Sequence, residues 1–155
     1  MTQPLVISSM ASTPEYQGTE LGTTPWIAIA QDRIELFARA TGDTRWIHLD
    51  AERAAVESPW KSTIADGLLL LSLVPGLITQ LIVLLGWSTA INTGVDRCEF
   101  PGVVTAGSRV RMGARLARVR VLPGQGCRLG FDIWFDVEGG QTPACRARVN
   151  YAYFT

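Results

Sequence analysis

The sequence predicts an α+β fold in which one long central helix is wrapped by a curled antiparallel sheet. Residues 64–86 form an almost unbroken apolar run with no charge after Asp66, which is typical of a helix buried on every side. After Trp87 the chain changes to segments of alternating polar and apolar residues separated by Gly and Pro, which is typical of antiparallel strands. A chain of 155 residues has the length of one domain. We assign residues 1–20 to a loosely ordered N-terminal arm and residues 21–155 to this single domain.

Two helices are predicted ahead of the apolar run. The first begins near Asp32, whose charge favours a helix N-terminus, and ends at Gly42. Its apolar positions recur at the spacing of one helical face: Ile34, Phe37, Ala38 and Thr41. The second spans residues 51–57 behind a capping Asp50. Residues 43–50 between the two are expected to form a polar loop.

The apolar run itself is predicted to be helical from about residue 65 to residue 85, with a kink or break at Pro75. The alternative for such a run is a membrane span. Polar residues in its middle, and the lack of Lys or Arg close to either end, argue against membrane insertion.

Strands are predicted before the first helix and after the central one. Charged and apolar residues alternate over residues 110–122 and 146–153, so these strands have one solvated and one buried face. Because a small curled sheet leaves open edges, we also expect a homodimer. The predicted strands cover residues 26–30, 89–100, 108–122, 126–138 and 144–154, with turns at Pro101-Gly102, Pro123-Gly124 and Gly139-Gly140.

Composition excludes several classes of function. The net charge is zero, Lys61 is the only lysine, and no basic block is present, so nucleic acid is not an expected partner. Cys98, Cys127 and Cys145 form no paired motif, which predicts small buried or half-buried residues and no disulfide, no metal and no cofactor. The N-terminus lacks the pattern of a secretory signal, so we expect a cytoplasmic protein.

The single histidine, His48, follows Asp43 by five residues in the loop before the central helix. A carboxylate and an imidazole at one site can hold a water molecule and move protons at neutral pH, since their usual pKa values are about 4 and about 6.5. In the alternative interpretation Asp43 caps a turn after Gly42 and His48 only packs beside it. The residues alone leave both interpretations open.

Residues 37–50, FARATGDTRWIHLD, and residues 63–73, TIADGLLLLSL, resemble the hydratase motif of MaoC-like acyl dehydratases. The Trp-Ile-His form is most similar to their NodN-like branch, and the resemblance extends over roughly residues 26–154. It implies a hotdog fold, in which the long helix is surrounded by an antiparallel sheet. It also implies reversible addition of water to the 2,3 double bond of an acyl thioester of coenzyme A or acyl carrier protein.

The resemblance also implies roles for particular residues. Asp43 and His48 are the expected catalytic pair. The backbone N–H of Gly67, with Asp66 beside it at the helix start, is expected to stabilise the charge that develops on the thioester oxygen. Gly67 has an alternative as a packing glycine at a tight helix entry. Three further residues are candidates for the substrate pocket: Trp46, Ile64 and Leu68.

The chain departs from the family pattern at two places. Asp66 stands where relatives usually have histidine, and Arg45-Trp46 stands where many members have Asn-Pro. Asp66 is expected to cap the central helix. A carboxylate at this position also resembles hotdog thioesterases, so an acyl thioesterase using Asp66 is an alternative function. A non-catalytic hotdog protein that binds an acyl thioester or a partner protein is the other.

Overall fold

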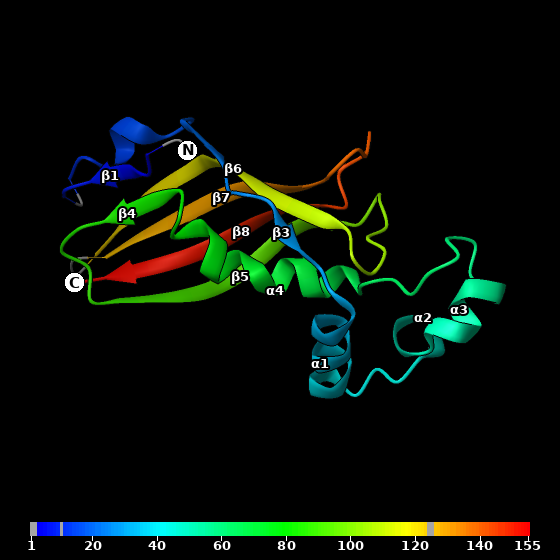
Figure 1. The fold of residues 1–155 in the computed structure, drawn as a ribbon. Coiled ribbons are helices and arrows are strands. Elements are labelled where there is room, and N and C mark those ends of the chain that lie inside the picture. The colour runs from blue at the N-terminus through cyan, green and yellow to red at the C-terminus, as the bar shows by residue number, and fades with distance from the viewer. Residues whose placement is uncertain (1–2, 10, 124–125) are drawn as a thin grey trace.

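The computed structural model describes residues 3–9, 11–123 and 126–155, and it has the predicted α+β architecture of one central helix against one antiparallel sheet. Helix α4 (Gly67–Ile78) lies across one face of the sheet, and three other helices gather beside its N-terminal end (Figure 1). These are α1 (Gln31–Thr41), α2 (Trp46–Leu49) and α3 (Ala51–Glu57). The arrangement brings the loop with the single histidine next to the start of α4.

Helices α1 and α3 begin and end where the sequence predicts. Gly42 terminates α1 in the left-handed region, with φ 76°, which glycine adopts without steric cost. The Asp50 side chain caps α3 by accepting a hydrogen bond from the Arg53 N–H at 2.9 Å. The loop predicted at residues 43–50 differs from the prediction, because it contains the single-turn helix α2.

The large sheet has six strands, all antiparallel to their neighbours, in the order β2-β6-β7-β8-β5 with β3 also paired to β6. The four long strands after α4 confirm the predicted ranges to within two residues. Gly124 lies outside the described residues, so the predicted turn at Pro123-Gly124 does as well. The strands are β2 (Glu20–Thr23), β3 (Ile27–Ala28), β5 (Thr89–Glu99), β6 (Arg109–Leu122), β7 (Gly126–Val137) and β8 (Cys145–Phe154).

The core forms between α4 and the inner face of the sheet. Helix α4 contributes side chains such as Leu70 and Val74, which are almost completely buried. Alternate positions of β6, β7 and β8 contribute buried side chains, and Phe131 and Phe135 on β7 are fully buried, whereas no residue of the edge strand β5 is buried. The period of two that the sequence shows in these strands therefore corresponds to one core face and one solvated face.

The apolar run is helical over a shorter range than predicted. Helix α4 includes Pro75 and ends at Ile78, after which β4 (Ile82–Leu84) pairs in parallel with β1 (Leu5–Ile7). The expectation of helix up to residue 85 was therefore wrong. The β-branched residues of this segment, Ile82 and Val83, favour an extended backbone once a second strand is available to pair with it.

The strand β1 lies in the segment that was expected to be a loosely ordered arm. Ile7 is fully buried, and the Leu5 N–H donates to the Leu81 carbonyl at 2.9 Å. A short 3-10 helix, η1 (Thr13–Tyr16), follows. The described part of residues 1–20 is thus held against the body of the protein, because its apolar residues complete a second, two-stranded sheet.

Two other expectations differ from the structure. Helix α4 is not covered on every side within one chain, since Leu68, Ser72, Pro75 and Thr79 form an exposed stripe along it. Cys98 is exposed, whereas Cys127 and Cys145 are buried as predicted. In the described part of the chain no helix combines the length and apolarity that crossing a membrane requires.

Candidate active site

The predicted site is assembled where three segments meet: the loop after α1, helix α2 and the start of α4. Residues 63–65 run as an extended segment between them. The Ile64 N–H donates to the Ile47 carbonyl at 3.0 Å, and the Ala65 N–H donates to the Val104 carbonyl at 2.8 Å. These bonds hold α2 and the loop before β6 on either side of the α4 N-terminus.

His48 is held in one orientation by its backbone and its ring. The Gln31 side chain of α1 donates to the His48 carbonyl at 2.9 Å and accepts a hydrogen bond from the buried Thr63 hydroxyl at 2.5 Å. The His48 ring Nδ1 lies 2.7 Å from the Ile64 carbonyl oxygen. Because a carbonyl oxygen only accepts, Nδ1 carries the hydrogen and Nε2 of the neutral ring has a free lone pair.

That Nε2 atom is buried and, among the described residues, has no hydrogen-bond partner. The side chain of His48 is only 6 % exposed, and Nε2 lies 3.5 Å from Oδ2 of Asp43. A buried nitrogen with an unused lone pair is costly unless water or a ligand satisfies it. The pair predicted from sequence is therefore brought together, and the His48 Nε2 atom is available to accept a proton.

Asp43 also makes the local bonds that the turn-cap interpretation requires. Its Oδ1 accepts from the Arg45 N–H at 3.2 Å, and both carboxylate oxygens accept from the Arg45 guanidinium, whose Nε lies 2.8 Å from Oδ1. The hydrogen bonds from Arg45 hold the pKa of the Asp43 carboxyl well below its usual range. Asp43 is thus a fixed anion beside the imidazole of His48.

Asp66 caps the helix as expected. Its Oδ1 accepts a hydrogen bond from the Leu68 N–H at 2.7 Å, and its Oδ2 lies 3.7 Å from Nη2 of Arg45. Asp43, His48 and Asp66 each place one ligand atom within 4.8 Å of the others. The guanidinium of Arg45 already supplies a positive charge to both carboxylates, so we assign these residues no metal-binding role.

Gly67 occupies a position where a side chain would not fit. A Cβ atom there would lie 2.5 Å from Cδ1 of Phe100, so the packing interpretation of this glycine holds. Its N–H is at the first turn of α4 and, within the described residues, donates no hydrogen bond. The same glycine therefore also offers a backbone donor at the positive end of the helix dipole.

A cavity of about 220 Å³ lies at the N-terminus of α4. Of the residues predicted from sequence, His48, Ile64, Asp66 and Gly67 line this cavity, and Arg45, which was not predicted, lines it too. Asp43 does not line the cavity, but it contacts His48 and Arg45, which do. Two predicted pocket residues do not line it, because Trp46 stacks against Arg53 at 4.5 Å and the Leu68 side chain is exposed. The other lining residues are Ala65, Leu70, Phe100, Gly102, Val103, Val104 and Ala144.

Sequence reasoning missed the wall opposite α4. Phe100 and Val103 come from the β5–β6 connection, and Ala144 precedes β8, so they lie far from the catalytic loop along the chain. The Pro101-Gly102 turn was recognised, but a turn signal does not reveal which cavity its neighbours face. Gln31 and Thr63 were missed too, because only the tertiary contacts show that they bind the His48 segment.

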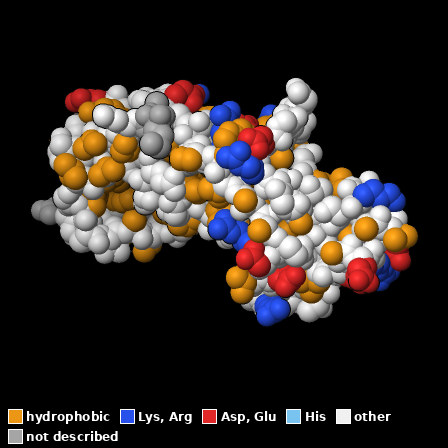
Figure 2. Space-filling model, viewed as in Figure 1, with side chains coloured by type: hydrophobic (Ala, Val, Ile, Leu, Met, Phe, Trp, Pro, Cys, Tyr) orange, Lys and Arg blue, Asp and Glu red, His pale blue; other side chains and the backbone are white. Residues whose placement is uncertain are grey.

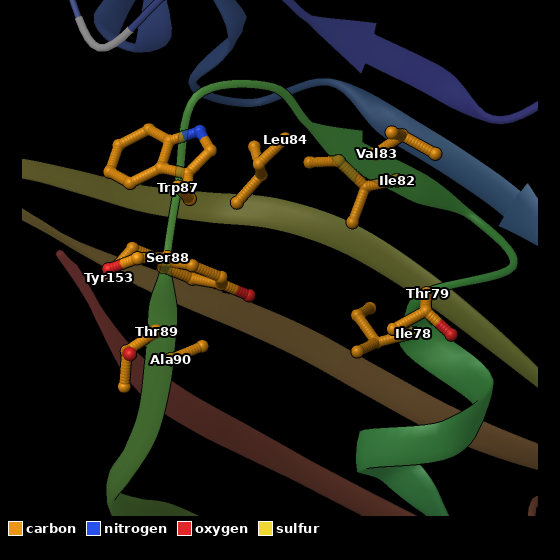
Figure 3. A pocket seen from close by; sticks show the side chains of 10 residues that line it. All are labelled: Ile78, Thr79, Ile82, Val83, Leu84, Trp87, Ser88, Thr89, Ala90 and Tyr153. Atoms are coloured by element: carbon orange, nitrogen blue, oxygen red, sulfur yellow. The ribbon is translucent and has the colours of Figure 1, made fainter. Parts of the chain in front are cut away.

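A second, apolar cavity of about 340 Å³ lies at the opposite end of α4 (Figure 3). The rings of Trp87 and Tyr153 form one side of it, and Ile78 and Ile82 form the other. It contains no carboxylate, imidazole or guanidinium among its lining residues.

Hydrophobic side chains also gather on the surface over this end of the molecule, whereas charged side chains gather over α1–α3 (Figure 2). The acid–base groups are therefore at the N-terminal end of α4.

Comparisons with known proteins identify the family of this chain. The profile of the MaoC like domain matches residues 12–125. The chain is 40% identical over 139 residues to 3-hydroxyacyl-thioester dehydratase Z of Mycobacterium tuberculosis, covering 90% of this chain and 91% of that protein. It is 36% identical over 140 residues to nodulation protein N of Rhizobium leguminosarum, covering 90% of this chain and 87% of that protein.

The fold is also that of solved members. An unliganded (R)-hydratase of Pseudomonas aeruginosa superimposes with a TM-score of 0.66 at 24% identity, covering 87% of this chain and 79% of that chain. This likeness confirms the predicted hotdog fold. The profile match covers most of the chain, and the two relatives match it over nearly its whole length. The chain therefore belongs to the MaoC-like domain family, as the Gly-Asp…His loop and the central helix predicted.

Proposed function

We propose that this protein is a hydro-lyase that acts as an enoyl-thioester hydratase or 3-hydroxyacyl-thioester dehydratase. The observation that carries the proposal is the buried Nε2 of His48, which has a free lone pair and faces Asp43 at 3.5 Å. It lines a cavity that ends at the N-terminus of α4. The dehydratase of M. tuberculosis, a 40% identical relative, is named for this reaction class.

In the hydration direction, His48 Nε2 accepts a proton from a water molecule whose oxygen bonds to C3 of the enoyl thioester. The resulting imidazolium then returns this proton to C2, so one proton is taken and one is given. Asp43 stabilises the imidazolium, because Arg45 keeps the pKa of the carboxyl low and Asp43 stays anionic. Dehydration is the reverse sequence.

The negative charge that develops on the thioester oxygen during this addition needs stabilisation. We assign that role to the Gly67 N–H, a donor at the positive end of α4 that lies next to His48 in the cavity wall. Ile64 forms part of the apolar wall near the reacting carbons. Trp46 and Leu68 lie outside this wall.

We further propose that the protein works as a homodimer. Strand β5 is at the edge of the sheet, and its apolar side chains Ile91 and Val95 are 50 % and 39 % exposed. The exposed stripe on α4 adds Leu68, which is 52 % exposed. An open edge with apolar neighbours is a surface that a second copy would cover.

The substrates, thioesters of coenzyme A or acyl carrier protein, assign the activity to the cytoplasm.

The test is an assay of the purified protein with crotonyl-CoA, in which loss of the enoyl thioester and release of free thiol are followed separately. Loss of the enoyl ultraviolet absorbance without thiol release is the expected result. Thiol release would instead identify a thioesterase, the alternative suggested by the presence of Asp66 in the cavity. If neither the enoyl absorbance nor the free thiol changes, the protein is a non-catalytic thioester-binding protein.

The variant Asp66→Asn separates the two enzymatic functions. In a thioesterase Asp66 is the base or nucleophile. Asp66→Asn should then lower the rate of thiol release by orders of magnitude. In a hydratase it caps α4, and asparagine also accepts the Leu68 N–H bond, so the helix should remain capped. The cap geometry supports the hydratase, because one Asp66 oxygen is already bound by the helix.

A further inference from the structure

Arg45 lies between two carboxylates: Asp66, which lines the cavity, and Asp43, which contacts His48 behind it. Its Nη2 lies 2.5 Å from Oδ2 of Asp43 and 3.7 Å from Oδ2 of Asp66. Its side chain is 66 % exposed, whereas those of Asp43 and Asp66 are 21 % and 24 % exposed. An exposed cation that lines the cavity thus bridges two partly buried anions that come from different elements, the α1–α2 loop and the start of α4.

The two anions have opposite consequences for the proposed reaction. Asp43 is needed beside His48, because an anion stabilises the imidazolium that forms there. Asp66 adjoins Gly67, so its negative charge lies beside the oxygen on which negative charge develops. Two like charges repel, and this repulsion grows as negative charge develops on the thioester oxygen. A cation near Asp66 offsets it.

Resting on the proposed function, we propose that Arg45 is a positioning residue that neutralises Asp66, so that a carboxylate can occupy the α4 N-cap without opposing the enolate. Arg45 thereby performs two tasks: it orients Asp43 through a bidentate fork and it compensates the charge of Asp66. The Arg45 pKa is raised further by its hydrogen bonds to Asp43, so this charge is permanent. Activity should therefore depend on Arg45 more strongly when residue 66 is acidic.

Few charged side chains lie near the contact between Arg45 and Asp66. Asp43 and Arg45 come from the loop, and Asp66 comes from α4. On α1, Glu35 contacts the same Gln31 side chain that binds His48, and it also pairs with Arg39 on the surface. Among the described residues, the ionisable side chains that line the cavity are Arg45, His48 and Asp66. The Arg45–Asp66 contact can thus be perturbed with little interference from further charges.

A double-mutant cycle with Arg45→Gln and Asp66→Asn tests the compensation. We expect Arg45→Gln to lower kcat for crotonyl-CoA hydration by at least about tenfold in the natural background, and by about threefold or less beside Asp66→Asn. Arg45→Lys should recover most of kcat, because lysine restores the charge without the fork. KM should change less than kcat, because the charge acts on the developing enolate. Arg39→Gln, which removes a surface arginine paired with Glu35 at 3.7 Å, is the matched control.

A second readout does not depend on turnover. Acetoacetyl-CoA forms an enolate with its own ultraviolet band, and a site that stabilises the thioester oxyanion increases that band on binding. Arg45→Gln should reduce the enolate band strongly in the natural background and only weakly beside Asp66→Asn. The urea midpoints of all four proteins show whether each is folded before the two effects are compared.

The outcomes separate the two proposals. An equal effect of Arg45→Gln in both backgrounds, with no recovery by lysine, overturns the compensation and leaves Arg45 acting on Asp43 alone. If the natural protein hydrates nothing but shows the coupled enolate signal, the proposed reaction is wrong and the compensation stands. Absence of both hydration and coupling overturns both.

Discussion

At the scale of single residues, the site depends on one imidazole whose two nitrogens have different surroundings. Nδ1 donates to the Ile64 carbonyl, and Nε2 is left free beside Asp43. The first contact fixes the tautomer and the second supplies the charge that stabilises the protonated ring. Asp43 both caps its turn and faces His48, so the two interpretations offered by the sequence are compatible.

This arrangement predicts large effects for two substitutions. Asp43→Asn and His48→Ala should each lower the hydration of crotonyl-CoA by at least about a hundredfold, because each removes a positioned proton-transfer group or its counter-charge. The initial rate of enoyl absorbance loss measures the effect. Asp50→Asn is the matched control, since Asp50 lies in the same segment but only caps α3. Near-normal rates in either site variant would show that the pair is purely structural.

At the scale of elements, the N-terminus of α4 is shaped by its contact with the β5–β6 connection. A Cβ atom added at Gly67 would collide with the Phe100 ring. A Cβ atom added at Gly76 in the same helix would meet no atom within 4 Å. A close contact therefore requires glycine at residue 67, whereas no contact requires it at residue 76.

Gly67→Ala should destabilise the protein by about 1–3 kcal/mol, because the added methyl group must displace the Phe100 ring. Gly76→Ala should instead stabilise it by about 0.5–1 kcal/mol, since alanine is the better helix former and meets nothing. Urea unfolding of both variants measures the difference. Adding Phe100→Leu to Gly67→Ala should recover part of the loss. Equal effects at the two glycines would contradict the role of Phe100.

At the scale of the whole molecule, one chain leaves apolar surface at the β5 edge and along α4 that a monomer has no reason to expose. Sedimentation should show a dimer at micromolar concentration. Ile91→Lys on β5 should shift it toward monomer, because a charge at a buried contact is costly. Val121→Lys on β6, separated from β5 by β7 and β8, is the control. A monomeric natural protein would refute the shared interface.

The core also predicts how stability depends on alkaline pH. Burial raises the pKa of the Cys127 thiol to about 11 and that of Cys145 to about 12, from an ordinary value of 9.0. Because the folded-state pKa values are raised, this contribution to stability is complete below pH 9 and is lost as the pH rises toward the folded values. We expect a loss of about 1 kcal/mol per thiol at pH 10.

Urea unfolding at pH 8, 9 and 10 measures this loss. Cys127→Ala should show a smaller decrease between pH 8 and pH 10 than the natural protein, because it lacks one of the two thiols. Partly buried Tyr153, whose pKa is also raised by desolvation, acts in the same direction at still higher pH. A free energy of unfolding that stays constant up to pH 10 would contradict the prediction.

Much of the local structure follows from the sequence. The boundaries of α1, α3 and the four long strands were predictable, because Gly42, capping Asp50 and the period-two alternation act over a few residues. The loop carrying Asp43 and His48 was predictable as well, from one carboxylate and the only histidine at a short spacing. These features depend on neighbours along the chain.

The rest was decided by tertiary structure, because it depends on contacts between distant segments. Helix α4 ends at Ile78 since residues 82–84 pair with β1, a partner that no local pattern indicates. Phe100 and Ala144 complete the cavity, and Gln31 fixes the His48 segment, through contacts far apart in sequence. The sequence alone determined which acid–base groups stand close together along the chain; folding decided which carboxylates share the Arg45 charge, because that depends on two elements meeting in space.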